Sequence, residues 1–266
     1  MQKLISYMAV KYITKIILLL LVTGVFFSCT SKKNIVYLQT DGDQQTATGI
    51  ANYEPLLQPD DALLIVISAE NPEVAAPYNM KSVSFQINSE IGMGQERLQS
   101  YLIDKEGNVD FPMLGKIKLA GLTRMGAIQK IKTLLTDHIK DPIVNLRILN
   151  FKVSVLGEVS RPGVQNVQTD RITLLEALSY AGDLTIYGKR NAIMIIREKE
   201  GVKTIEKVDI TKRDFINSPY YYLSQNDVVY VEPNKTKVNA SVIGPNITVG
   251  ISALSLIITI IALTIR

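Results

Sequence analysis

Two residue types that often carry chemistry are nearly absent from this sequence. Of its 266 residues, one is cysteine, Cys29, and one is histidine, His138. A single cysteine excludes an internal disulfide, and a single histidine makes a Ser-His-Asp triad or a histidine-rich metal site implausible. The adjacent acids Asp60 and Asp61 suit a turn better than a glycosidase site. We therefore predict that the protein is not an enzyme and holds no metal or cofactor.

An excess of charge is also missing once the first residues are set aside. The formal net charge is +4, and residues 1–28 contain three lysines and no acidic residue. Without that segment the net charge falls to about +1, which leaves no strong electrostatic preference for one partner. No Lys/Arg-rich stripe remains, so we expect no nucleic-acid partner.

The first residues follow the order of an export signal. Lysines precede an apolar core over Ile16–Phe27, which is too short for a comfortable membrane span. Cys29 follows the core after Ser28, and this placement resembles a lipobox, whose cysteine is acylated and becomes the mature N-terminus. The alternative is an ordinary signal peptide with an incidental cysteine. We predict a signal peptide over residues 1–28, lipidation at Cys29, and a polar lipidated tether over residues 29–52.

The C-terminal end carries a second membrane signal. Residues Ile247 to Arg266 form an apolar run whose only charge is the terminal arginine. A helix of this length reaches about 30 Å, roughly the thickness of the hydrocarbon core of a bilayer. We therefore predict a transmembrane helix over residues 247–266, preceded by a linker over residues 234–246.

Small and hydroxyl-bearing residues share one face of this predicted helix. They follow a 4-3-4-3 spacing, which keeps them in one stripe: Thr248, Ser252, Ser255, Thr259 and Ala262. Such a stripe is typical of a seam where membrane helices approach closely. The second interpretation is a lumen, in which copies of the helix form a ring with the stripe facing water. The four hydroxyl residues are thus pore-lining candidates, and the spacing does not choose between seam and lumen.

The sequence between these segments predicts two folded blocks. In the first, over residues 53–150, Tyr101–Asp104 and Val109–Phe111 form a hairpin whose turn contains Gly107. A helix begins at Thr123 and continues with apolar residues at helical spacing. Strands that surround one amphipathic helix make a small α+β domain.

The second block, over residues 151–233, also surrounds one short helix. A capping box over Thr173–Glu176 starts this helix, and Gly182 ends it. The predicted strands are Phe151–Val155, Ala192–Arg197, Thr204–Ile210 and Val228–Val231. A sheet of four or five strands with one helix suggests a β-grasp fold, so the fold class of the whole chain is α+β with a C-terminal helix.

Several segments together resemble one bacterial family. They are Leu57-Gln-Pro-Asp-Asp61, Ile103–Gly115 with Gly121-Leu-Thr123, Val155–Gly163 with Thr173–Ala177 and Ala181-Gly182, and Tyr221-Tyr-Leu223 with Asn226-Asp227. Their order and spacing are similar to the outer-membrane polysaccharide export lipoproteins, which have an export domain followed by a soluble-ligand-binding (SLBB) β-grasp domain. Asp60 departs from the usual Gly, and Gly126 replaces the Glu that would complete a capping box with Thr123. Only one β-grasp repeat is present, which implies a shorter periplasmic body.

The resemblance implies a passive, porin-like channel. Several copies would form a homo-oligomeric ring, lipid-anchored in the outer membrane with soluble domains in the periplasm, that passes capsular polysaccharide or exopolysaccharide to the cell surface. The C-terminal helices would cross the outer membrane as an α-helical barrel. Implied partners are the polysaccharide, membrane lipid, and an inner-membrane chain-length regulator or polymerisation machinery.

Two other functions stay open on the sequence. One is a periplasmic adaptor anchored in the inner membrane by its C-terminal helix, and the other is a capsule-binding tether that transports nothing. Tyr220–Tyr222 offer aromatic rings that suit stacking on sugars, although packing within a strand explains at least one of them.

Overall fold

The computed structural model describes residues 32–39, 53–84, 95–199, 201–242 and 245–264. The chain divides into two compact units, Met1–Val36 and Tyr37–Arg266. In the described part of the first unit, the short 3-10 helix η1 spans Lys32–Asn34. The predicted signal peptide, residues 1–28, and the lipidation candidate Cys29 lie outside the described residues, so both stay predictions. All elements below belong to the second unit.

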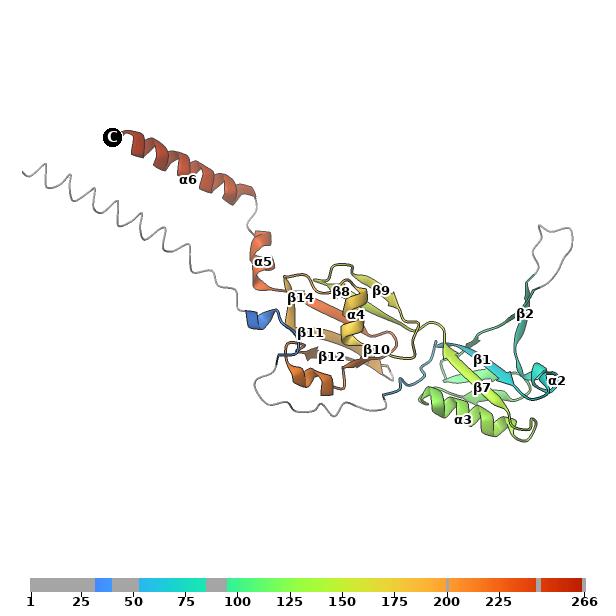
Figure 1. Ribbon diagram of the computed structural model, residues 1–266. Coiled ribbons are helices and arrows are strands. Elements are labelled where there is room, and N and C mark those ends of the chain that lie inside the picture. The colour runs from blue at the N-terminus through green and yellow to red at the C-terminus, as the bar shows by residue number, and fades with distance from the viewer. Residues whose placement is uncertain (1–31, 40–52, 85–94, 200, 243–244, 265–266) are drawn as a thin grey trace, which may run out of the picture. The chain divides into compact units, whose positions relative to one another are not determined.

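The first block is built on a three-stranded antiparallel sheet in the order β4-β1-β7. Its central strand β1 (Ala62–Ser68) pairs with β7 (Ile143–Ile148) and, at its start, with β4 (Tyr101–Leu102). Side chains of β1 alternate between buried and half-buried, as in a strand with one face on a core. The helix α3 (Arg124–Leu135) packs against β7 (Figure 1) and contributes the buried side chains of Ala127, Ile131 and Leu135.

Shorter elements complete the block. They are α2 (Pro72–Ala75), η2 (Ala76–Tyr78), the hairpin of β2 (Lys81–Ser84) with β3 (Gln95–Leu98), and the hairpin of β5 (Asn108–Phe111) with β6 (Gly115–Lys118). The turn at Gly107 forms as predicted, with a φ of +84° that favours glycine. The predicted strand pairing around it is wrong, because β4 pairs with β1 and β5 with β6. Tyr101 instead stacks on Phe111 at 5.2 Å, so the two segments share a core without sharing a backbone ladder.

Two departures from the family pattern have visible structural consequences. Asp60 adopts a φ of +68°, a left-handed conformation that glycine adopts most easily and that Asp tolerates better than most residues. Thr123 caps α3 by accepting a hydrogen bond from the Gly126 N–H at 3.1 Å. Because Gly126 has no side chain to return a bond to the Thr123 N–H, only half of a capping box is present.

The second block contains a five-stranded mixed sheet in the order β12-β11-β14-β8-β9. Its strands are β8 (Lys152–Gly157), β9 (Gly163–Asn166), β11 (Gly188–Lys199), β12 (Val202–Val208) and β14 (Val228–Pro233). The pair β14–β8 is parallel, and the other pairs are antiparallel. The short strands β10 (Ile172–Thr173) and β13 (Tyr222–Leu223) pair separately, and η3 spans Arg213–Asn217. The predicted strands of this block fall on β8, β11, β12 and β14.

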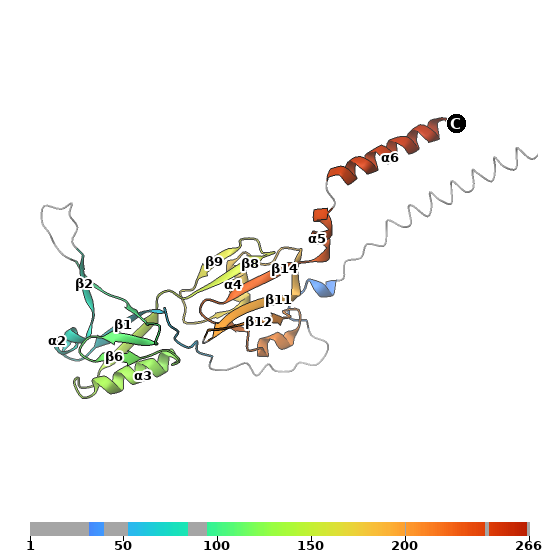
Figure 2. The same cartoon turned by 180° about the vertical axis from the view of Figure 1, so that it is seen from behind.

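The predicted short helix of this block is confirmed as α4 (Leu174–Tyr180), which lies against the sheet (Figures 1 and 2). The capping box is complete, because the Thr173 N–H donates to the Glu176 carboxylate at 2.7 Å and the Glu176 N–H donates to the Thr173 hydroxyl at 3.2 Å. Gly182 has a φ of +74°, the left-handed stop expected at this end.

Each block has a separate hydrophobic core. The first core includes the buried side chains of Leu57, Ile65, Tyr101, Ile131 and Leu146. The second core includes those of Phe151, Val155, Leu178, Ile195 and Val229. Burial of these apolar side chains is the main stabilising contribution to each block. The predicted α+β class is confirmed as a mixed architecture of strands and helices.

The segment from Tyr37 to Gln39 packs on the second block. The Leu38 N–H donates to the Ile210 carbonyl at 3.0 Å, and the Gln39 N–H donates to the Thr211 carbonyl at 2.7 Å. The predicted tether, residues 29–52, is therefore not free along its whole length. Its residues 40–52 lie outside the described part.

Two helices follow β14. They are α5 (Lys235–Val242) and α6 (Pro245–Thr264), so the predicted linker over residues 234–246 is largely helical. The C-terminal helix exists, but among the described residues no helix is both long enough and apolar enough to cross a membrane. The prediction of a helix at the C-terminal end is confirmed, but the prediction that residues 247–266 span a membrane is not supported. Such a span needs about 20 consecutive, predominantly apolar residues.

The incomplete cap of α3 predicts a stabilising substitution. Gly126→Glu should raise the free energy of unfolding by about 1–2 kcal/mol, because it adds helix propensity and completes the capping box with Thr123. An added Cβ meets its nearest atom, the Thr123 hydroxyl, at 3.4 Å. Urea denaturation would measure the change. Gly126→Ala is the control that gains propensity alone, and equal stability of the two variants would contradict the capping contribution.

Candidate functional site

A single residue between the two blocks, Asn150, connects them by hydrogen bonds. Its side-chain carbonyl accepts from the Ala62 N–H and its side-chain amide donates to the Asp60 carbonyl, both at 2.9 Å. Its backbone carbonyl accepts from the Gln225 side-chain amide at 2.9 Å, and the Gln225 side chain accepts from the Lys152 N–H at 2.8 Å. We call these hydrogen bonds the Asn150 joint. They fix the start of β1 against the loop that precedes β14.

A buried carboxyl group, Asp61, lies next to this joint. Only 1% of Asp61 is exposed, and its Oδ2 accepts from the Gln58 N–H at 2.8 Å. Within the described part of the chain, its Oδ1 has no hydrogen-bond partner. Burial raises the pKa of Asp61 to about 6, and the Gln58 N–H and the Gln225 side chain only partly offset that rise. The charged form of this carboxyl is therefore unfavourable in the folded protein.

A second buried carboxyl group, Asp227, is paired. Arg197 from β11 donates through Nε to Oδ1 at 3.0 Å and through Nη2 to Oδ2 at 2.7 Å. The Asp227 side chain is 0% exposed, and its Oδ2 also accepts from the Ser224 N–H at 2.8 Å. Burial raises the pKa of the Asp227 carboxyl, and the hydrogen bonds and charge of Arg197 offset part of this effect. This bidentate pair gives the segment around Tyr222 a defined geometry, since Arg197 also donates to the Tyr222 carbonyl at 3.2 Å.

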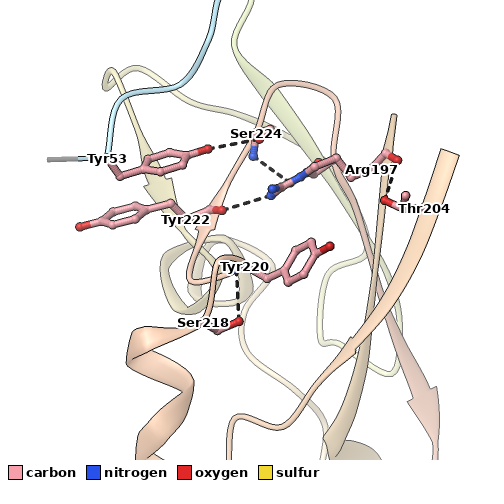
Figure 3. A network of polar contacts seen from close by, with 8 residues as sticks. Tyr53, Arg197, Thr204, Ser218, Tyr220, Tyr222 and Ser224 are labelled. Atoms are coloured by element: carbon pink, nitrogen blue, oxygen red, sulfur yellow. Dashed lines mark hydrogen bonds and ion pairs between the residues drawn. The ribbon is translucent and has the colours of Figure 1, made fainter. Parts of the chain in front are cut away.

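Tyrosine rings gather on this segment (Figure 3). Tyr222 stacks face to face on Tyr53, with ring centroids 4.8 Å apart and planes 6° apart. The hydroxyls of Tyr53 and Ser224 are hydrogen-bonded at 3.2 Å. Tyr221 meets Tyr222 edge-on at 5.0 Å, whereas Tyr220 and Tyr221 both pack against the second core. Of the three tyrosines that the sequence offered for sugar stacking, Tyr222 is thus the one stacked on a ring of the first block.

A pocket of ≈ 340 Å³ opens beside Tyr53. Its lining includes the charged residues Glu54, Arg124, Asp170 and Arg171. Arg124 and Asp170 form an ion pair at 3.3 Å. The guanidinium carbon of Arg171 lies 5.1 Å from the centroid of the Tyr222 ring. A concave site with one aromatic wall and several charged groups suits a small polar ligand.

Two family models match this chain. A model described as polysaccharide biosynthesis/export protein matches residues 50–149, and an SLBB domain model matches residues 151–231. Together these segments cover more than half of the chain. This protein belongs to the polysaccharide export family. Asn150 is the one residue between its export domain and its SLBB domain.

Two curated relatives are both named "EPS I polysaccharide export outer membrane protein EpsA". One is from Ralstonia solanacearum and is 27% identical over 191 residues, and the other is from Ralstonia nicotianae and is 28% identical over 191 residues. The alignments cover 69% of this chain and 50% of each relative. The chain therefore spans about half the length of these relatives.

The pore-lining candidates lie on α6, apart from the pocket. The Ser255 hydroxyl donates to the Ser252 carbonyl, and the Thr259 hydroxyl donates to the Ser255 carbonyl, both at 2.8 Å. Such bonds to the preceding turn satisfy hydroxyls within the helix itself. Thr248 also lies in α6, but its side chain is outside the described residues. Whether the stripe lines a pore stays a prediction.

His138, the one histidine of the sequence, lies near the C-terminal end of α3. It is exposed and lies near Tyr78, with ring centroids 6.1 Å apart. Within the described ranges, no group of three or more His, Cys, Asp or Glu side chains is arranged to hold a metal ion.

The sequence did not single out the residues that form the pocket. Tyr53, Arg124 and Arg171 come from separate segments of the chain, and none belongs to a recognisable local motif. The one local signal in the sequence was the Tyr220–Tyr222 run. It points to Tyr222, which stacks on Tyr53, but it does not indicate Tyr53 itself.

The buried state of Asp61 predicts a pH-dependent stability. The pKa of Asp61 is raised to about 6 in the folded protein. The protonated carboxyl therefore stabilises the fold below the pKa of the unfolded chain, and this stabilisation is lost as the pH rises through about 6. The full effect is on the order of 3 kcal/mol. Asp61→Asn should flatten the free energy of unfolding between about pH 4 and pH 7 relative to the wild type. Urea titrations at several pH values would measure it.

Asp60→Asn is the matched control for this experiment. Asp60 is exposed and left-handed, and asparagine tolerates that conformation. The charge of Asp60 makes the smallest contribution to the raised pKa of Asp61, so the control should keep most of the wild-type pH dependence. An Asp61→Asn profile parallel to that of the wild type would contradict the assignment.

Proposed function

We propose that this protein exports a polysaccharide from the periplasm to the cell surface. The observation that carries the proposal is the order of a polysaccharide biosynthesis/export domain and an SLBB domain, matched over residues 50–149 and 151–231. The names of the two Ralstonia relatives, which include "export" and "outer membrane", support the same function and location.

We further propose that copies of the chain assemble into a ring. The side chains of α6 from Val249 to Ile260 are exposed, including Val249 at 66% and Ile251 at 64%. Apolar surface of this extent favours burial against another molecule, and one helix encloses no passage. In the ring, the stripe of Ser252, Ser255 and Thr259 faces inward. Because the hydroxyls of Ser255 and Thr259 already donate within their own helix, this lining offers few donors that would retain a passing sugar.

The proposed lipid anchor would act on the SLBB domain. Tyr37 is held there by a 2.6 Å hydrogen bond from its hydroxyl to Asp183. The eight residues from Cys29 to Tyr37 reach at most about 28 Å when extended. An acylated Cys29 would therefore keep this domain close to the membrane surface. The helix α5 also follows directly from β14 of the SLBB domain, so the proposed anchor and the C-terminal helices leave from the same domain.

Polymer localisation in a strain that lacks this protein tests the function. Loss of the protein should leave polymer in the periplasm and remove it from the surface, while polymer synthesis continues. We expect an inner-membrane polymerisation or chain-length partner to supply the chain. Normal surface polymer in the deletion strain would overturn the proposal. Fractionation with the inner membrane would instead indicate the adaptor function, and a purely monomeric, outer-membrane protein would indicate the tether.

Variants of the α6 stripe test the ring. The double variant Ser255→Leu with Thr259→Leu should reduce surface polymer severalfold or more, because bulky apolar side chains would narrow and dry the passage. The matched control, Leu254→Ile with Ile258→Leu, changes the other faces of α6 and should export normally. Detergent-solubilised mass should remain that of an oligomer in both. Loss of the oligomer in the stripe variant would favour the packing seam, and unchanged export would contradict the lumen.

A variant of Cys29 tests the anchor. Cys29→Ala should abolish incorporation of labelled palmitate and move the protein out of the outer-membrane fraction, because a single acylated cysteine supplies the anchor. Cys29→Ser, which also cannot form the thioether, should behave the same way. Unchanged labelling and sorting in both variants would rule out lipidation at this position.

A further inference from the structure

The pocket beside Tyr53 has one cation that forms no ion pair with any described residue. Asp170 is neutralised by its ion pair with Arg124 at 3.3 Å. Glu54 accepts from the Met125 N–H at 3.4 Å, in the first turn of α3, where a helix dipole favours a carboxylate. Arg171 is exposed and forms no ion pair with any described residue. The pocket therefore presents a free guanidinium.

The position of Arg171 is nevertheless well defined. Its guanidinium carbon lies 5.1 Å from the centroid of the Tyr222 ring, a cation–π arrangement. The Thr169 hydroxyl donates to the Arg171 carbonyl at 2.7 Å, which orders the backbone of this loop. A guanidinium held on an aromatic face keeps its donor edge available, and that edge matches a carboxylate in bidentate geometry.

The aromatic wall of the pocket is ordered as well. Tyr53 is half-buried, stacks on Tyr222 at 4.8 Å, and shares a hydrogen bond with the Ser224 hydroxyl at 3.2 Å. These contacts leave the ring little freedom, so a ligand would lose little entropy from ordering it. A flat aromatic surface with a polar hydroxyl suits the apolar C–H face and hydroxyl rim of a pyranose ring.

We propose that this pocket binds one acidic sugar unit of the exported polymer, with the sugar carboxylate on Arg171 and the sugar ring beside Tyr53. The proposal rests on the export function and names its substrate class as a carboxylate-bearing polysaccharide. The volume of ≈ 340 Å³ is within the range of small-molecule sites, about 300–1,000 Å³. The lining comes from the export domain and the SLBB domain, so the polymer would contact both at once.

Binding of defined oligosaccharides tests this inference on the full-length protein in detergent. Isothermal titration with trigalacturonate should show binding, and the uncharged analogue galactotriose should bind at least tenfold more weakly, because the charge-assisted bond to Arg171 is lost. Arg171→Ala and Arg171→Gln should each weaken trigalacturonate binding about tenfold or more. Arg147→Ala is the matched control, since Arg147 is an exposed arginine of β7 outside the pocket, and it should bind like the wild type.

The outcomes separate this inference from the export function. Equal trigalacturonate affinity of the wild type and both Arg171 variants, with folding verified by circular dichroism, would overturn the pocket assignment. Equal affinity for trigalacturonate and galactotriose, or no binding of either, would overturn the acidic-sugar class. None of these results touches export, which is judged by surface polymer in the deletion strain. If the deletion strain loses surface polymer and the purified protein binds neither sugar, the pocket assignment is rejected and the export function stands.

Discussion

The hydrogen bonds of Asn150 are the constraint on which the proposed site depends. Its side chain binds the backbone at Asp60 and Ala62, while its backbone carbonyl binds the Gln225 side chain. These partly buried and exposed hydrogen bonds join the start of β1 to the loop that precedes β14. This arrangement brings Tyr53 from the segment before β1 against Tyr222 of β13. The pocket lies beside Tyr53, on the export-domain side of this stacked pair.

Two buried carboxyl groups beside the joint are stabilised in opposite ways. Asp227 has a bidentate partner in Arg197, which satisfies its charge where water is excluded. Asp61 has no cation; its Oδ2 accepts from the Gln58 N–H, and burial raises its pKa to about 6. A paired charge gives a geometry that changes little with pH, whereas an unpaired carboxyl is most favourable when protonated. Beside the joint, burial raises the pKa of both carboxyl groups, and only at Asp227 does a cation offset part of that rise.

The helix α6 presents a different physical situation from the two domains. The domains bury their apolar side chains in their own cores, but α6 exposes its apolar side chains from Val249 to Ile260. Its hydroxyls at Ser255 and Thr259 are satisfied inside the helix, which makes the stripe polar in composition but weak in hydrogen-bond donation. An exposed apolar surface of this kind favours burial against another molecule. That combination underlies the proposed ring.

Features set by neighbouring residues were predictable from the sequence alone. The capping box of Thr173 with Glu176, the half-box at Thr123 and the left-handed position at Gly182 all depend on hydrogen bonds or dihedral preferences within a few residues. The strands β8, β11, β12 and β14 followed from alternating apolar residues for the same reason. The family could also be identified, because its segments keep their order along the chain.

Only the tertiary structure decided what depends on residues far apart in the chain. The pairing of β4 with β1 instead of β5, and the meeting of Tyr53 with Tyr222, both follow from which packing of the whole chain satisfies the most buried groups. That Arg171 forms no ion pair with a described residue is decided in the same way, since it depends on which segments fold around it. Local sequence carries the energies of local contacts, and it does not contain the balance of long-range burial and hydrogen bonding that selects one arrangement among many.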